Sequence, residues 1–131
     1  IIDIVVPTYH RYEILSETLQ SVQSQTYERW ECWIAEDGSS DETFTAVEPF
    51  LRDKRFHYLP GDHSGTPATP RNRALRAGRA PHIAFLDDDD IWLLEKLYKI
   101  NPSVLSSSVN FPEKKVKITF NSKNVFRPKI Y

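Results

Sequence analysis

The sequence has 131 residues, of which 40% are hydrophobic and 27% are charged, and its net charge is −1. This length fits one globular domain with its own core, and no apolar run approaches the roughly 20 residues that a membrane span needs. Cys32 is the only cysteine, which excludes an intrachain disulfide and a cysteine zinc cluster. Because charged and polar side chains interrupt the start, we find no signal peptide and expect a cytoplasmic protein.

The net charge hides an asymmetry along the chain. Residues 1–100 carry a net charge of −6, whereas residues 101–131 carry +5. We therefore divide the chain into a first part, 1–100, and a basic tail, 101–131. The basic residues of the tail can face phosphates, an anionic membrane surface or the acidic first part, or can form an ordinary solvated surface.

The first 36 residues predict a strand, a helix and a second strand, in that order. The apolar run IDIVVP at 2–7 predicts a buried strand that proline ends. Leu15, Leu19 and Val22 then recur at the spacing of an amphipathic helix. The aromatic and β-branched run WECWIAE at 30–36 predicts a second buried strand.

A second helix is expected after the turn DGSSDE. Ser39 followed by Glu42 has the pattern of a capping box, and Pro49 should kink or shorten the helix. The apolar residues expected on one face of this helix are Phe44, Val47 and Leu51.

The middle of the chain contains a short strand, FHYL at 56–59, and a long loop rich in turn residues at 60–70. Thr69 is the candidate N-cap of the next helix, with Pro70 at its first position and Gly78 just past its end. A fourth strand, HIAFL, follows this helix.

The strand HIAFL ends at 86, and four aspartates occupy 87–90. A further helix should begin in IWLLEKL at 91–97, and VKITF at 116–120 predicts an isolated strand. Because strands and helices alternate four times over the first 100 residues, we expect an α/β fold with a largely parallel sheet.

Ligands of open parallel sheets bind outside the carboxyl ends of the strands, and polar clusters follow three of the predicted strands. These clusters are PTYHR at 7–11, EDGSSDE at 36–42 and the aspartates at 87–90. Adjacent carboxylates repel each other by about 2–3 kcal/mol per pair at an effective dielectric near 20. A solvated acidic turn is the simple alternative, but the shared edge favours a divalent cation bound by carboxylate oxygens.

The chemistry of this edge suits a nucleoside diphosphate. Tyr9 offers a flat face on which a base can stack, and Asp37 can accept hydrogen bonds from a ribose or a base. Asp87, Asp88 and Asp89 can hold a cation against a diphosphate, so that a departing phosphate is stabilised.

Four stretches resemble the family-2 glycosyltransferases, which have the GT-A fold. They are VVPTYHRYEILSETLQSVQSQTY, WIAEDGSSDET, TPRNRALRAGRAPHIAFLDDDD and IWLLEKL. The resemblance covers about residues 2–97. It implies a GT-A (Rossmann-like) open, mostly parallel sheet flanked by helices and incomplete on its C-terminal side. Residues 1–100 would be the nucleotide-sugar-binding half, and 101–131 a remnant of the acceptor-side half.

The resemblance also implies roles for individual residues. Asp89 would be the direct metal ligand with Asp87, in an aspartate-any-aspartate (DXD) motif that binds Mn²⁺ or Mg²⁺, and Asp90 would support the turn. The residues implied to bind the nucleotide-sugar are Pro7, Thr8, Tyr9, Asp37, Arg71, Asn72, Asp87 and Asp88.

The implied activity is the inverting, metal-dependent transfer of a hexose from a nucleotide-diphospho-sugar, UDP-linked by resemblance, to the hydroxyl of a glycan, lipid or protein. Such an enzyme serves polysaccharide biosynthesis, has no nucleic-acid partner and can contact the inner face of a membrane peripherally. The acceptor half of the family is not recognisable here. Beyond the fourth stretch the chain offers one acidic residue, Glu113, which we do not assign as the general base, so the catalytic base stays unknown.

Other classes remain open. A haloacid-dehalogenase-like phosphotransferase would use Asp87 as nucleophile and Asp89 as acid/base, but its downstream motifs are not found. A nucleotidyltransferase lacks its glycine-rich loop here, and an EF-hand would need glycine where Trp92 stands. An incomplete domain that binds nucleotide or cation without turnover is the remaining alternative.

Overall fold

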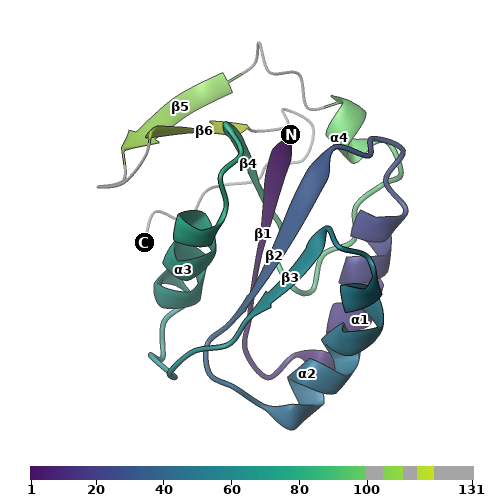
Figure 1. The fold of residues 1–131 in the computed structure, drawn as a ribbon, viewed down its shortest axis with the longest axis vertical. Helices are drawn as coiled ribbons and strands as arrows, with labels where there is room; N and C mark the ends of the chain where they lie inside the picture. Colours follow the sequence, from purple (N-terminus) through teal and green to yellow (C-terminus); the bar gives the residue numbers. More distant parts are fainter. Residues whose placement is uncertain (100–104, 111–114, 120–131) are drawn as a thin grey trace.

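The computed structural model describes residues 1–99, 105–110 and 115–119, which form a six-stranded sheet with helices on both faces (Figure 1). The strand order is β3-β2-β1-β4-β6-β5. Every neighbouring pair is parallel except β5 with β6, which is antiparallel. The expected α/β class with an open, mostly parallel sheet is confirmed.

Five of the six described strands lie close to the apolar runs that predict them, whereas β5, with the polar sequence LSSSVN, has no such run. The six strands are β1 (Ile2–Thr8), β2 (Trp30–Glu36), β3 (Phe56–Leu59), β4 (His82–Phe85), β5 (Leu105–Asn110) and β6 (Lys115–Thr119). All seven residues of β1 are buried because this strand is central and covered on both faces. The run at 116–120 was wrongly expected to be isolated, because β6 pairs with β4 through His82↔Lys117 and Ile83↔Ile118.

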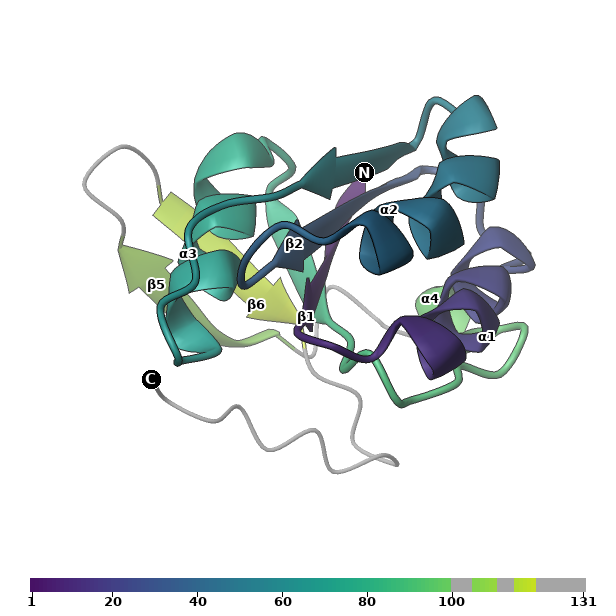
Figure 2. The ribbon, with the colours of Figure 1, turned by 90° about the horizontal axis from the view of Figure 1, so that it is seen from below.

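Helices cover the two faces of the sheet unequally. The helices are α1 (Tyr12–Gln23), α2 (Asp41–Val47), the 3₁₀ helix η1 (Glu48–Arg52), α3 (Ala68–Ala77) and α4 (Lys96–Lys99). Both views show α1 and α2 on one side of the sheet and α3 on the other (Figure 1, Figure 2). None of the helices that the structure describes has the length and apolarity to cross a membrane.

The larger core lies between the sheet and the side of α1 and α2. The predicted stripe of Leu15, Leu19 and Val22 is confirmed, because all three side chains are fully buried in this core. The smaller core, under α3, contains Val5, Ala35, Ala74, Leu75 and Ile83.

The second helix begins one residue later than the capping pattern suggests. Ser40, not Ser39, is the N-cap, and its Oγ accepts a hydrogen bond from the Thr43 amide at 3.2 Å. The Ser40 hydroxyl also donates to the Glu36 carboxylate at the end of β2, at 2.8 Å. Phe44 is 42% exposed, so its expected place on the buried face is wrong. Pro49 shortens the helix as expected, since the α-helix gives way to η1 there.

The third helix begins before the expected N-cap. Pro67 is the N-cap and Ala68 the first helical residue, so Thr69 already lies inside the helix. Pro70 falls in the first turn, where backbone N–H groups have no partner within the helix, and its missing N–H therefore costs nothing. The Thr66 hydroxyl accepts the Ala68 amide at 3.3 Å instead.

The segment after the acidic run is helical only from Lys96, not from its start. Residues that follow α1 bond the backbone of this segment instead. The Gln25 side chain donates to the Leu93 carbonyl at 2.7 Å, and the Thr26 amide donates to the Leu94 carbonyl at 3.0 Å. These carbonyls would otherwise accept helical hydrogen bonds. Of the basic tail 101–131, the described part is the backbone of β5 and β6, and Glu113 lies outside it.

Candidate functional site

A cavity of about 380 Å³ lies at the carboxyl ends of the parallel strands, between the first turn of α3 and the acidic run. Its volume is in the range of small-ligand sites. Thr8 is paired with Glu36 at the end of the β1–β2 register, so the polar clusters that follow these strands start at the same edge. The lining residues are Pro7, Thr8, Tyr9, Arg11, Asp37, Gly65, Thr66, Pro67, Pro70, Arg71, Asp87, Asp88 and Asp89.

The structure brings together all of the predicted site residues except Asn72. That side chain is exposed on α3 and does not belong to the described lining. Sequence reasoning did not name Arg11 as a site residue, although it lies within the polar cluster at 7–11. It also missed the wall formed by Gly65, Thr66 and Pro67, which it treated as a turn-rich loop without a place in the site.

The four aspartates do not share one role, because Asp88 turns inward. Its carboxylate accepts a hydrogen bond from the Thr8 hydroxyl at 2.8 Å, and its backbone carbonyl accepts one from the Thr18 hydroxyl at 2.9 Å. Asp88 is 8% exposed. Burial raises the pKa of this carboxyl above its ordinary value, against the lowering effect of the Thr8 hydrogen bond. Asp88 therefore ties β4 to β1 at the floor of the cavity.

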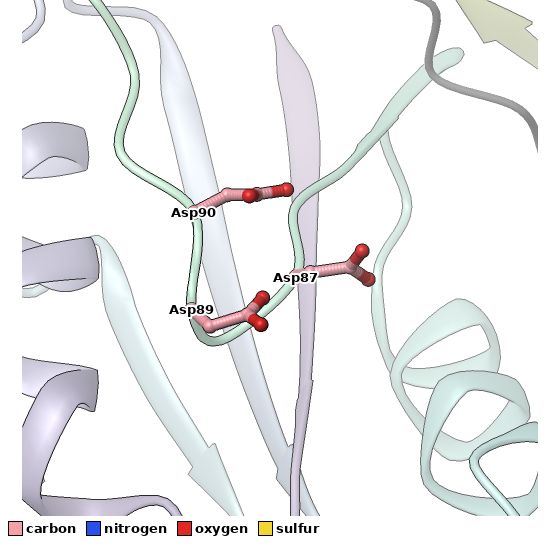
Figure 3. A group of neighbouring side chains, drawn as sticks. All are labelled: Asp87, Asp89 and Asp90. Atoms are coloured by element: carbon pink, nitrogen blue, oxygen red, sulfur yellow. The ribbon is translucent and has the colours of Figure 1, made fainter.

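The other three aspartates form an outward-facing group, shown in Figure 3. One carboxylate oxygen from each of Asp87, Asp89 and Asp90 lies within 4.8 Å of the others. The Asp90 amide donates to the Asp87 carbonyl at 3.1 Å, which closes the turn. Burial and the charges of Asp87 and Asp89 raise the pKa of Asp90. Clustered carboxylate oxygens of this kind suit a hard divalent cation.

Two arginines balance the acidic run from opposite sides. Arg11 Nη1 lies 3.2 Å from Asp89 Oδ2, and Arg11 Nε lies 3.7 Å from Asp88 Oδ1. Across the cavity, Arg71 Nη2 lies 3.8 Å from Asp87 Oδ1, and its guanidinium lies over the Phe85 ring. The Arg71 side chain is 11% exposed and that of Arg11 is 52% exposed, so Arg11 has the greater freedom to move.

Asp37 lies at the other end of the cavity and is almost fully buried. Its carboxylate accepts hydrogen bonds from the Ser64 amide at 2.8 Å, the Ser64 hydroxyl at 2.7 Å and the Gly65 amide at 3.0 Å. Burial acts to raise the pKa of Asp37, but these hydrogen bonds and His63 hold it below its ordinary value. Asp37 is therefore an ionised acceptor at neutral pH.

Tyr9 follows β1, and 48% of its surface is exposed. Its ring stacks on His63, with centroids 4.7 Å apart and planes inclined by 21°, and it meets His10 edge-on at 4.3 Å. His63 contacts Asp37 as well, with its Nδ1 3.2 Å from Asp37 Oδ2. The cavity thus has an aromatic, hydrogen-bonding end and an acidic end.

The sequence matches the model of the glycosyl transferase family 2 over residues 3–105. It is 35% identical over 111 residues to the UDP-Glc:alpha-D-GlcNAc-diphosphoundecaprenol beta-1,3-glucosyltransferase WfgD of Escherichia coli, covering 85% of this chain and 44% of that protein. It is 31% identical over 100 residues to the putative teichuronic acid biosynthesis glycosyltransferase TuaG of Bacillus subtilis, covering 76% and 40%. The chain thus spans less than half the length of these curated relatives.

Solved structures agree with this match. The crystal structure of S. aureus TarS 1-349 in complex with UDP superposes with a TM-score of 0.70 at 29% identity, over 74% of this chain and 30% of that chain. The mannosyltransferase PcManGT from Pyrobaculum calidifontis, in complex with GDP-Man and Mn²⁺, is 24% identical and shares the fold with a TM-score of 0.64, over 70% and 28%. The expected GT-A fold is confirmed, and glycosyltransfer is favoured over the phosphotransferase and nucleotidyltransferase alternatives. With its family model matched over most of its length, the chain belongs to glycosyl transferase family 2.

Proposed function

We propose that this protein transfers a sugar from a nucleotide-diphospho-sugar to an acceptor hydroxyl, and that residues 1–100 contain the donor-binding half. The observation that carries the proposal is the two-ended cavity, with Tyr9 and Asp37 at one end and the acidic run at the other. A nucleoside fits the first end and a diphosphate with its cation fits the second. UDP is the favoured carrier because two similar proteins, WfgD and TarS, are named with UDP-Glc and UDP.

The nucleoside end is assigned to Pro7, Thr8, Tyr9 and Asp37. The exposed Tyr9 ring offers a stacking surface, a type of contact worth about 1–3 kcal/mol per base in nucleic-acid complexes. Arg71, which lines the cavity beside Asp87, faces the diphosphate in this arrangement. Asn72 is exposed on α3 outside the described lining, and we assign it no contact with the donor.

The donor set of the acidic end fits a divalent cation. Asp87, Asp89 and Asp90 offer three carboxylate oxygens within 4.8 Å of one another, a hard-ligand set that suits Mn²⁺ or Mg²⁺. A cation bound there would neutralise negative charge on the leaving diphosphate. Asp88 acts differently, since its hydrogen bond to Thr8 holds the acidic run against β1.

The reaction is a displacement at the anomeric carbon with inversion. The acceptor oxygen forms the new bond to that carbon as the bond to the diphosphate oxygen breaks, and the nucleoside diphosphate leaves with the bonding electrons. The acceptor proton passes to a general base, which we do not assign. The dense negative charge of the leaving group is met by Arg71 and Arg11, the two cavity arginines.

The acceptor is proposed to be a lipid-linked saccharide, in a pathway of polysaccharide biosynthesis at the inner face of a membrane. The support is the naming of two E. coli relatives, WfgD and WfaP, for GlcNAc-diphosphoundecaprenol. Peripheral contact with a membrane surface would bring such an acceptor to the protein.

Calorimetric titration with UDP, with and without Mn²⁺, tests the donor site. We expect UDP to bind more tightly with the cation, and UDP at 100 times its Kd to stabilise the fold by about 2.7 kcal/mol. ADP with Mn²⁺ is the matched control for base preference. The absence of binding by any nucleoside diphosphate, with or without cation, would exclude the proposed function.

A further inference from the structure

The loop between β3 and α3 occupies most of the hydrogen-bonding capacity of Asp37. An ionised carboxylate offers about four acceptor positions. Ser64 takes two of them through its amide and hydroxyl, Gly65 takes one through its amide, and His63 Nδ1 lies 3.2 Å from Asp37 Oδ2. A base or ribose that binds Asp37 can therefore use the acceptor position beside His63, while Ser64 and Gly65 hold the carboxylate through the others.

His63 also supports the second residue of the nucleoside end. Its ring stacks on Tyr9 while its Nδ1 faces Asp37, so one side chain touches both residues. Within the described part of the chain, neither His63 nor Ser64 belongs to the cavity lining, whereas Gly65 does. Both residues are exposed, and their side chains lie beside the cavity, outside its described lining.

The base of this loop is anchored independently of those contacts. The Gly61 amide donates to the Gly38 carbonyl at 2.9 Å. Arg73 Nη1 donates to the Glu36 carbonyl at 2.8 Å and to the Leu59 carbonyl at 3.3 Å. Because these bonds stay in place when a side chain of His63 or Ser64 is truncated, such a truncation should loosen the site without unravelling the loop.

We propose that His63 and Ser64 are positioning residues, which hold the Tyr9 ring and the Asp37 carboxylate in place for the nucleoside of the donor. This inference rests on the proposed function. The support is mutual, because the Asp37 carboxylate also holds Ser64 and Gly65, and Gly65 lines the cavity. Ordering the site before binding lowers the entropy that the ligand must overcome.

The test compares Ser64→Ala and His63→Ala with the unmodified protein by calorimetry, using UDP, UMP and Mn²⁺ alone as separate ligands. Each variant should weaken UDP and UMP by the same factor, about 3–10-fold, since both ligands carry the nucleoside. Mn²⁺ affinity without nucleotide should not change, which a general loss of structure would not predict. Ser64→Thr, which keeps the hydroxyl, should restore the UDP affinity.

Ser40→Ala is the matched control. Ser40 donates to the Glu36 carboxylate at 2.8 Å, as Ser64 does to Asp37, but it caps α2 and Glu36 does not line the cavity among the described residues. This control should lower thermal stability and leave the UDP affinity unchanged.

Two results would overturn the inference while the proposed function stands. Unchanged UDP affinity in both variants would mean that Asp37 and Tyr9 need no support from the loop. Tighter binding by His63→Ala would mean that His63 occupies the place of the base. If the unmodified protein binds no nucleotide, the proposed function fails and this inference fails with it.

Discussion

The Thr8 hydroxyl donates a hydrogen bond to Asp88 Oδ2 at 2.8 Å and so joins the ends of two neighbouring strands across 80 residues of sequence. Both residues are buried, and both line the cavity. This bond sets the direction of the acidic run, because the inward turn of Asp88 leaves the aspartates on either side of it facing outward.

Thr8→Val should remove this donor while keeping the shape of the side chain. The buried Asp88 carboxylate loses a partner, so the free energy of unfolding should fall by about 1–3 kcal/mol in urea denaturation. Thr26→Val is the control, because the Thr26 hydroxyl bonds the Leu94 carbonyl at an exposed position and its loss should cost less than about 0.5 kcal/mol. Equal losses in the two variants would contradict the role given to the buried bond.

Asp89→Asn should impair cation binding at the acidic end of the cavity and leave nucleotide binding at the other end intact. The exposed Asp89 belongs to the outward carboxylate group, not to the nucleoside end. We expect the gain in UDP affinity on adding Mn²⁺ to disappear, while UDP binding in EDTA persists. Asp41→Asn, on the exposed first turn of α2, should keep the full effect of Mn²⁺. A normal response to Mn²⁺ in Asp89→Asn would show that the cation binds elsewhere.

Arg11→Gln should strengthen the binding of Mn²⁺ in the absence of nucleotide. Arg11 Nη1 lies 3.2 Å from Asp89, so its positive charge competes with a cation for the same carboxylate. Because Arg11 is half exposed and solvent screens the pair, the gain in Mn²⁺ affinity should be small, about 2–5-fold. A titration followed by electron paramagnetic resonance of free Mn²⁺ measures it. Arg52→Gln, on exposed η1, should leave the affinity unchanged. Weaker Mn²⁺ binding by Arg11→Gln would contradict the competition.

Asp53→Asn should reduce the loss of stability in acid. Hydrogen bonds from Arg55 hold the pKa of Asp53 below its ordinary value, against the effect of burial. A lowered pKa stabilises the fold fully above the unfolded-state value near 3.9, and this stabilisation is lost as the pH falls through the folded-state value. Between pH 6 and pH 3, the unmodified protein should therefore lose more unfolding free energy in urea than Asp53→Asn. The control is Glu17→Gln, at an exposed position of α1. It should lose as much unfolding free energy over this pH range as the unmodified protein.

Local sequence located the strands well and the helix ends less well. The strands follow from burial of each residue's own apolar surface, so runs such as 30–36 predict them directly. Helix ends depend on which neighbour satisfies the terminal backbone groups. Ser40, which also bonds Glu36, is the cap in place of Ser39. The helix expected from residue 91 begins only at Lys96, and Gln25, 68 residues away in sequence, bonds the Leu93 carbonyl before it.

The sequence by itself determined that this is an α/β chain with three polar clusters at the ends of buried strands, and its motifs named most of the cavity residues. Alternation of apolar runs carries that information because each strand and helix must bury its own apolar face. Only the tertiary structure decided which of four identical carboxylates does what. Asp88 turns inward because its donor, Thr8, comes from another strand, and Asp37 is held by Ser64, which lies 27 residues away. Hydrogen-bond partners so distant in sequence exist only once the sheet has formed.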